Sequence, residues 1–221
     1  GMTNNGFSEG AVKALWDTIL PFAGYAFNKS HAAGYGLVSY WTAYLKANHP
    51  AEYMAAVLSN NMSDIKKVTF FMEECRRMGV PVLGPDVNES EFKFAVNAEG
   101  AIRFGLGAMS GVGEGAVQSI IENRQEATYE GIFDFATKVN LKDCNKRVFE
   151  ALAQGGAFDD LPKAIFRAQC FAPDAKGRTT IELAIRYGQA TQESENSSQA
   201  SLFGGESGGM DIPEPPVPAV E

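Results

Sequence analysis

The chain has 221 residues, of which 45% are hydrophobic and 21% are charged, and its formal net charge is −8. This composition is typical of a globular protein with one large domain or two small ones. No apolar run approaches the ~20 residues that a membrane helix needs, and no secretory signal opens the chain. Three scattered cysteines indicate reduced thiols rather than a disulfide framework or a zinc site, so we expect a cytoplasmic protein.

The negative charge is concentrated at one end of the chain. Residues 189–221 contain six acidic residues and no Lys or Arg, so this tail carries −6 and the rest of the chain only −2. Basic residues outnumber acidic ones by four to one in residues 138–147 and by five to two in residues 163–187. A nearly neutral body with local basic patches predicts weak attraction to nucleic acid rather than strong electrostatic binding.

The first part of the chain, to residue 79, has the pattern of a helix bundle. Apolar periodicity predicts helices over residues 11–20, 30–48, 51–60 and 64–78. The next part is different, because residues 92–96 and 101–104 alternate around a turn at 97–100. This alternation predicts a short β-hairpin.

Asn28, Lys29, Ser30 and His31 precede the long second helix. Ser30 is a suitable N-cap, and the flanking Lys29 and His31 could place a cation and a hydrogen-bond donor at a phosphate. In the alternative interpretation Ser30 only caps the helix, His31 is a surface residue and the helix's aromatic residues form core. Composition alone favours the second interpretation.

The most informative stretch is FGLGAMSGVGEGAVQSII, residues 104–121. Gly111 and Gly113 permit a tight reversal, and Val112 between them would fill the space where two helices meet. A helix beginning at about Glu114 would present free N–H groups and its dipole to an anion such as a backbone phosphate. The pattern is that of a helix-hairpin-helix, which binds nucleic-acid backbone without reading sequence. A glycine-rich turn with no ligand is the alternative.

A second hairpin follows the first, with helices expected over residues 129–139 and 145–154. Asn145 is a suitable N-cap for the second of these helices. Lys146 and Arg147 fall in its first turn, where bases are unfavourable for the helix dipole, and this placement hints at an external anion. An ordinary solvated helix face explains these two residues equally well.

The C-terminal part begins with helices expected near residues 163–169 and 180–187, and it then becomes rich in Ser, Gln, Gly and Pro. Residues 210–220 contain four prolines, which predicts a linker or disorder. Within this polar tail lies the isolated pentapeptide QASLF, residues 199–203. Leu202 and Phe203 have the character of anchors for a partner's pocket, with Gln199 as the polar contact that sets the register. Chance occurrence of so short a pattern is the alternative.

Residue patterns for catalysis are missing. The chain has no D-x-D pair for two-metal phosphoryl transfer and no P-loop, and His31 and His49 are its only histidines. We therefore expect no reacting centre and no metal site in this chain.

Together these stretches resemble the alpha subunit of bacterial DNA polymerase III, the C-family of replicative polymerases. The resemblance covers about residues 7 to 161, in family order and spacing. It is carried by FAGYAFNKSHAAGYGLVSYWTAYLKANHPAEYMAAVLS, ECRRMGVPVLGPDVNES, IRFGLGAMSGVGEGAVQSIIENR and NKRVFEALAQGGAFD. It implies a mainly α fold: a fingers-type helix bundle, a short β-hairpin, tandem helix-hairpin-helix and a flexible tail.

The resemblance also implies an organisation into four parts. Residues 1–79 would be the C-terminal part of the fingers domain, and residues 80–161 the small β-hairpin with the tandem helix-hairpin-helix DNA-binding region. Residues 162–188 would form a helical linker. Residues 189–221 would be a flexible acidic tail with a clamp-binding motif.

Site residues follow from the same resemblance. Asn28, Lys29, Ser30 and His31 would face the incoming-nucleotide side of the fingers. Backbone N–H groups of the turn would hold a phosphate of the product duplex, with Lys146 and Arg147 nearby. The turn residues are Ser110, Gly111, Val112, Gly113, Glu114 and Gly115. Gln199, Leu202 and Phe203 would occupy the pocket of the bacterial sliding clamp.

The family's palm, with its catalytic aspartates and Mg²⁺, lies upstream of the matching stretches. The chain alone is therefore expected to have no cofactor and no polymerase activity, although its parent is a DNA-directed DNA polymerase. The implied partners are duplex DNA, the sliding clamp and other replicase subunits, with no membrane. Two other classes remain open: a stand-alone helix-hairpin-helix repair accessory protein and a pure interaction scaffold.

Overall fold

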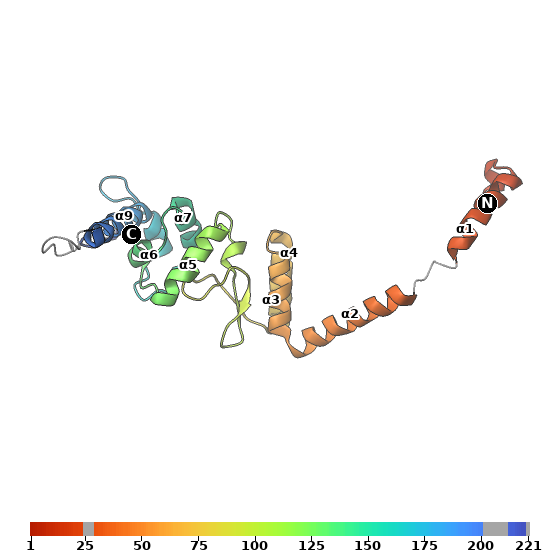
Figure 1. Cartoon of the computed structure of the whole chain (residues 1–221), viewed down its shortest axis with the longest axis horizontal. Coiled ribbons are helices and arrows are strands. Elements are labelled where there is room, and N and C mark those ends of the chain that lie inside the picture. Colours follow the sequence, from red (N-terminus) through yellow and green to blue (C-terminus); the bar gives the residue numbers. More distant parts are fainter. Residues whose placement is uncertain (24–28, 201–211, 220–221) are drawn as a thin grey trace. The chain divides into compact units, whose positions relative to one another are not determined.

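The computed structural model describes residues 1–23, 29–200 and 212–219, and the side chains of 195–200 are not considered. The described chain is mainly helical with one small sheet, as expected (Figure 1). It divides into two compact units, Gly1–His49 and Pro50–Glu221. The two helices that follow His49 pack on the small sheet within the second unit. None of the described helices is both long and apolar enough to cross a membrane.

The first unit consists of a short 3-10 helix, η1 (Thr3–Asn5), and two α-helices, α1 (Glu9–Ala23) and α2 (Lys29–Asn48). No described side chain of this unit is buried. The aromatic residues of α2 therefore do not form a core within the unit, in contrast to the second interpretation of this helix. Large apolar side chains of both helices are exposed, among them Trp16, Phe22, Tyr35, Tyr40, Trp41 and Tyr44.

The second unit begins with a helix pair that packs on a small sheet. Helices α3 (Pro50–Asn60) and α4 (Ile65–Arg77) are followed by strands β1 (Val82–Leu83), β2 (Ala95–Val96) and β3 (Ile102–Arg103). The strand order is β1-β3-β2, with β3 antiparallel to β2 and parallel to β1. The predicted hairpin is thus confirmed as β2–β3, and β1 is a third strand that the sequence analysis did not anticipate.

The rest of the unit is helical. It contains the 3-10 helix η2 (Leu106–Ala108), α5 (Glu114–Glu126), α6 (Ile132–Lys138), α7 (Lys146–Gly155), α8 (Arg167–Phe171) and α9 (Thr180–Ala200). Buried aromatic rings lie at the centre of their shared core, where Phe135 packs edge-to-face on Tyr129, Phe149 and Phe158. We call this the hairpin core, because it includes both predicted hairpins.

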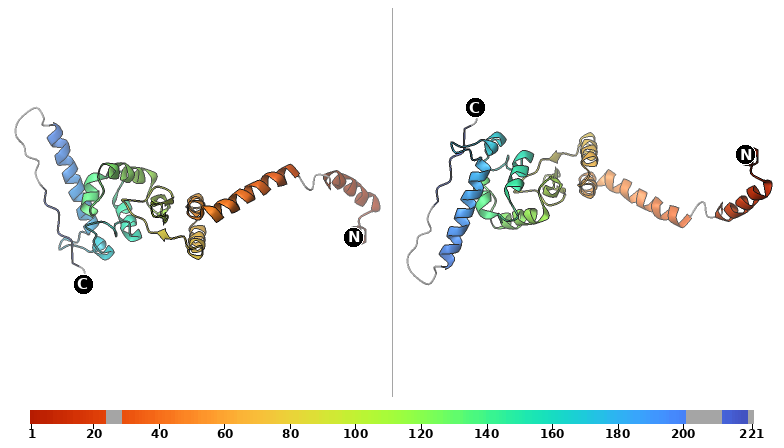
Figure 2. Two further views of the ribbon diagram at one scale, coloured as in Figure 1. Left: turned by 90° about the horizontal axis from the view of Figure 1, so that it is seen from below. Right: turned by 90° about the horizontal axis from the view of Figure 1, so that it is seen from above.

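Helix α9 packs on α6 as part of this core, as Figures 1 and 2 show. Ile181 and Ala184 of α9 are fully buried. The side-chain amide of Gln192 donates hydrogen bonds to the carbonyls of Ala136, Thr137 and Val139, and these groups at the end of α6 would otherwise lack partners. Residues expected as a helical linker thus belong to the core, and α9 continues well beyond the expected end near residue 187.

Candidate nucleic-acid interface

The glycine turn at residues 110–113 reverses the chain between η2 and α5. Gly111 has φ +92°, a left-handed conformation that side chains disfavour. Val112 is 7% exposed and packs into the hairpin core, as its predicted filling role requires. The first arm of this hairpin is only the three-residue 3-10 helix η2, shorter than the α-helical arm expected, because Met109 adopts an extended conformation directly after it.

The beginning of α5 is open to solvent. Gly113 is the N-cap, in an extended conformation, and no side chain caps the helix from this position. Ser110, Gly113, Glu114 and Gly115 are all exposed, and a Cβ atom added to Gly113 would meet nothing within 4 Å. The first N–H groups of α5 are therefore accessible to a ligand, which is the geometry that an anion needs at a helix N-terminus.

The second hairpin brings two charged side chains to this turn. The loop between α6 and α7 is fixed against α5 by a hydrogen bond of 2.9 Å from the Asn140 amide to Ser119 Oγ. Arg147 Nε lies 3.2 Å from the position that a Cβ atom would take at Gly111. Asp143 Oδ1 lies 3.4 Å from the corresponding position at Gly115. The two hairpins thus converge on one exposed surface, which we call the turn surface: residues 110–115 with Asp143 and Arg147.

The N-terminus of α7 differs from that of α5, because its amides are already bonded. Asn145 is the N-cap, as predicted, and its side-chain oxygen accepts hydrogen bonds from the amides of Arg147 and Val148, at 3.0 and 3.3 Å. An anion would have to displace this cap. The N-terminus of α5 therefore has free amides, whereas two amides at the N-terminus of α7 are bonded to Asn145.

Lys146 and Arg147 also differ from one another. Lys146 Nζ lies 2.8 Å from a carboxylate oxygen of Glu182 and 3.7 Å from one of Glu150. The hydrogen bond that Lys146 donates to Glu182 is the main cause of the raised pKa of this lysine. Arg147 is exposed and has no ion-pair partner within the described ranges. Arg147 is thus the cation that the structure leaves available at the turn.

Most cations of the two basic patches have carboxylate partners. The pairs, with N···O distances of 2.5 to 2.8 Å, are Lys138–Asp134, Lys163–Glu130, Arg167–Asp159 and Arg178–Asp174. Glu114 and Asp143 add negative charge beside the turn itself. These carboxylates offset the positive charge of both basic patches and of the turn surface.

The other predicted site residues are distant from the turn surface along the sequence. Asn28, Leu202 and Phe203 lie outside the described residues. Lys29 begins α2, so Ser30 is in the first turn of this helix rather than at the N-cap, and the His31 ring stacks on Tyr35 with 4.3 Å between centroids. Gln199 is in the last turn of α9.

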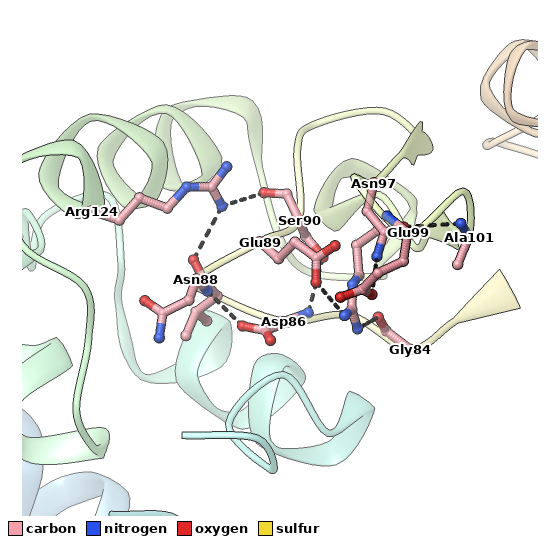
Figure 3. A network of polar contacts seen from close by, with 11 residues as sticks. Gly84, Asp86, Asn88, Glu89, Ser90, Asn97, Glu99, Ala101 and Arg124 are labelled. Carbon is pink, nitrogen blue, oxygen red and sulfur yellow. Dashed lines mark hydrogen bonds and ion pairs between the residues drawn. The ribbon is translucent and has the colours of Figure 1, made fainter. Parts of the chain in front are cut away.

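The sequence analysis missed the polar loop at residues 84–91, which connects the sheet to the hairpin core (Figure 3). Arg124 of α5 donates hydrogen bonds to the carbonyls of Val87 and Ser90, and Arg103 of β3 pairs with Glu89. Asn88 and Tyr129 exchange hydrogen bonds of 2.8 and 2.9 Å. The run of polar residues after Pro85 was the available signal. These contacts position α5, and hence the turn surface, on the sheet.

No group of three or more His, Cys, Asp or Glu residues in the described part of the chain could hold a metal ion. Two of the three cysteines have strongly raised pKa values: burial raises the pKa of the Cys144 thiol to about 12 and that of Cys170 to about 11. These thiols are therefore poor nucleophiles and poor metal ligands.

Comparison with known proteins agrees with this geometry. The model of the helix-hairpin-helix motif family matches residues 79–169. DNA polymerase III subunit alpha of Mycobacterium tuberculosis is 46% identical over 217 residues, which are 97% of this chain and 17% of that protein. The subunits of Pseudomonas fluorescens and Escherichia coli are 44% and 45% identical over 211 and 162 residues. These cover 93% and 73% of this chain, and 18% and 14% of the relatives.

The resemblance to the alpha subunit of bacterial DNA polymerase III is therefore confirmed. The chain spans less than a fifth of the length of these curated relatives.

Proposed function

We propose that this chain is a non-catalytic segment of a bacterial replicative DNA polymerase that holds the backbone of duplex DNA without reading sequence. The observation that supports it best is the open N-terminus of α5 at Gly113, with Arg147 close to the neighbouring Gly111 and without an ion-pair partner among the described residues. Backbone N–H groups would bind one phosphate and the guanidinium a second oxygen of it or a neighbouring phosphate. Lys146 could bind a phosphate only if its ion pair with Glu182 were broken.

The similarity to DNA polymerase III subunit alpha supports the replicative context. In this proposal, template-directed synthesis belongs to the parent, whose palm and Mg²⁺ lie outside this chain. Residues 1–79, including Lys29, Ser30 and His31, would be the end of the fingers domain. The exposed aromatic residues of α1 and α2 support this proposal, because such side chains are normally covered in a complete protein.

Titration of the chain with a fluorescent duplex of random sequence tests DNA binding. At low salt we expect binding that is independent of sequence. With two or three phosphate contacts, a fourfold rise in salt should weaken binding about 10- to 40-fold. Arg147→Gln should reduce the affinity several-fold, whereas Lys176→Gln, which removes one exposed charge outside the turn surface, should have little effect.

Absence of binding at low salt would instead favour an interaction scaffold, in which the turn is only structural. Sequence-dependent binding would contradict backbone recognition. Addition of primed template, nucleotides and Mg²⁺ should give no primer extension, since the chain lacks residue patterns for phosphoryl transfer.

We also propose that Gln199, Leu202 and Phe203 bind the bacterial sliding clamp. The position of Gln199 at the end of α9, with an isolated Leu-Phe pair directly after the helix, supports a short peptide presented beyond the folded body. Replacing Leu202 and Phe203 by Ala should weaken clamp binding about tenfold or more, because apolar anchors dominate such interfaces. Met210→Ala, in the same tail, is the matched control. Unchanged affinity of the double variant would rule out this assignment.

A further inference from the structure

The C-terminal segment Ile212–Ala219, with the sequence IPEPPVPA, packs against the folded body. It has no helix or strand, and Figure 2 shows it, in dark blue, running back beside the helices of the second unit. Its four prolines have a fixed φ and no N–H group, so an extended conformation of this segment loses little entropy when it docks. The expectation of a plain linker here is thus replaced by a docked segment, which we call the strap.

The strap lies in a groove between the beginning of α6 and the loop before α8. Val217 packs against the hairpin core, and the Gln169 side-chain amide donates a hydrogen bond of 3.3 Å to the Pro218 carbonyl. Glu214 and Val217 line one side of a cavity of about 30 Å³, and Phe133, Lys163 and Ile165 line the other. This volume has room for about one water molecule, so the fit is close.

The two faces of the strap are distinct. Ile212, Pro215, Val217 and Pro218 are half-buried, whereas Pro213, Glu214, Pro216 and Ala219 are exposed. Glu214 also lies close enough to Lys163 to contribute, after Glu130, to the raised pKa of that lysine. The groove therefore offers an apolar contact, one amide donor and a nearby cation to an extended, acidic, proline-rich peptide.

We propose that this groove is a binding seat for a proline-rich extended peptide and that its occupant is the chain's own strap. Docking fixes the chain at Ile212, while α9 fixes it at Ala200. Ile212 follows the end of α9 by only twelve positions in the sequence. This inference does not depend on DNA or clamp binding, although Leu202 and Phe203 lie between α9 and the strap in the sequence.

We expect the strap to dock in its groove stably but reversibly. The linkage through residues 201–211 gives the strap a local concentration of about millimolar at its seat, so a weak contact suffices to close it. Four half-buried residues and one hydrogen bond to a carbonyl make a small interface. A partner that binds the sequence between α9 and the strap could therefore open it.

Paramagnetic relaxation in the full chain tests the proposal. A nitroxide label on Ala219→Cys reports the position of the strap, and the native thiols do not compete for the label because Cys75, Cys144 and Cys170 are buried. We expect the label to broaden the amide signals of Ile132, Phe133 and Lys163. The amide signals of Val68 and Ile102, which belong to the other core, should keep the chemical shifts of the unlabelled chain and so show that the labelled chain is folded.

Two substitutions that add the same charge distinguish broadening caused by docking of the strap from broadening caused only by proximity along the chain. Val217→Asp should abolish the broadening, because it buries a carboxylate in the seat without a partner. Pro216→Asp, on the exposed face, should retain it. Absence of broadening in the labelled parent chain would overturn the proposal, as would broadening that persists in Val217→Asp. Equal loss in both variants would also overturn it, because Val217 would then not be the anchor.

Discussion

At the scale of single residues, the two glycines of the turn have different roles. Gly111 is required by its positive φ and by the nearby Arg147 side chain. Gly113 has φ −87°, which any residue adopts, and its Cβ position is open. Conformation and packing therefore explain why glycine occurs at position 111, but they do not explain why it occurs at position 113. Under the proposed function, the missing side chain at Gly113 leaves the α5 amides accessible to a phosphate.

Gly113→Ala tests this reason. Folding stability should change by less than about 1 kcal/mol, because Ala fits the conformation and restricts the unfolded chain but is a poorer N-cap than Gly. Affinity for duplex DNA should fall several-fold, because the new methyl group lies beside the amides that would hold a phosphate. Urea unfolding and a DNA titration at low salt measure the two effects. A variant that binds DNA as the parent does would contradict a phosphate site at this turn.

Gly111→Ala provides the contrast at the neighbouring glycine. Ala at φ +92° is strained, and its Cβ would lie 3.2 Å from Arg147 Nε, so we expect a loss of about 1–2 kcal/mol in unfolding free energy. The midpoint of urea unfolding measures this loss. Equal stability of the two variants would show that the left-handed turn does not form in solution.

Paired carboxylates predict the acid sensitivity of the fold. Hydrogen bonds from Arg178 lower the pKa of Asp174 to about 2. Burial alone would raise the pKa of Glu89, but hydrogen bonds from Arg103 and Asn97 hold it below its ordinary value. A carboxyl whose pKa is lower in the folded state stabilises the fold above its unfolded pKa, and this contribution is lost as pH falls.

We therefore expect the thermal midpoint to be constant near neutral pH and to fall between about pH 4.5 and pH 2. Melting curves across this range measure it. In Asp174→Asn the fall with pH should be less steep, because one of the titrating carboxylates is absent. A midpoint that rises on acidification would contradict the pairing of these groups.

At the scale of elements, local patterns determined what could be predicted. The β2–β3 hairpin, the Asn145 cap and the start of α5 follow from residues next to one another in the chain. Strand β1 could not be found in this way, since only two residues pair and their partner, β3, is about twenty residues away. The packing of α9 was missed for a related reason, because Gly188 and Gln192 contact α6 more than fifty residues earlier.

The same limit applies to the candidate site. Gly111, Val112 and the α5 N-terminus were recognisable from the local sequence. The different roles of Lys146 and Arg147 were not, because they depend on Glu182 from another helix and on the turn of another hairpin. Contacts between residues that are distant in the sequence and meet only in the tertiary structure cannot be predicted from adjacent residues.

Gly188→Ala tests the close crossing of α6 and α9. A Cβ atom at this position would lie 2.2 Å from the Ala136 carbonyl oxygen, so the helices would have to separate. Overpacking of this kind should lower the unfolding free energy by about 1–3 kcal/mol, more than the gain in helix propensity from Ala. Gly34→Ala, in a helix where the Cβ position is open, should be neutral or stabilising. Denaturant unfolding of both variants measures the difference.

At the scale of the whole molecule, the two units differ in how their apolar residues are covered. The Pro50–Glu221 unit has two cores, one between α3, α4 and the sheet and the other around the two hairpins. All described members of these cores lie at residue 51 or later. The Gly1–His49 unit has large exposed apolar side chains and no buried residue in its described part. The first unit is therefore the part that needs a covering surface.

Removal of residues 1–49 tests this difference between the units. The shortened chain, beginning at Pro50, should keep the unfolding midpoint of the full chain, because the two cores contain none of the deleted residues. It should also aggregate less, since the deletion removes exposed side chains such as Trp16, Phe22 and Trp41. Calorimetry and light scattering at equal concentration measure the two effects. A midpoint that falls by several degrees would show that the first unit contributes to the stability of the second. Loss of duplex DNA binding on deletion would show that residues 1–49 are needed for that binding.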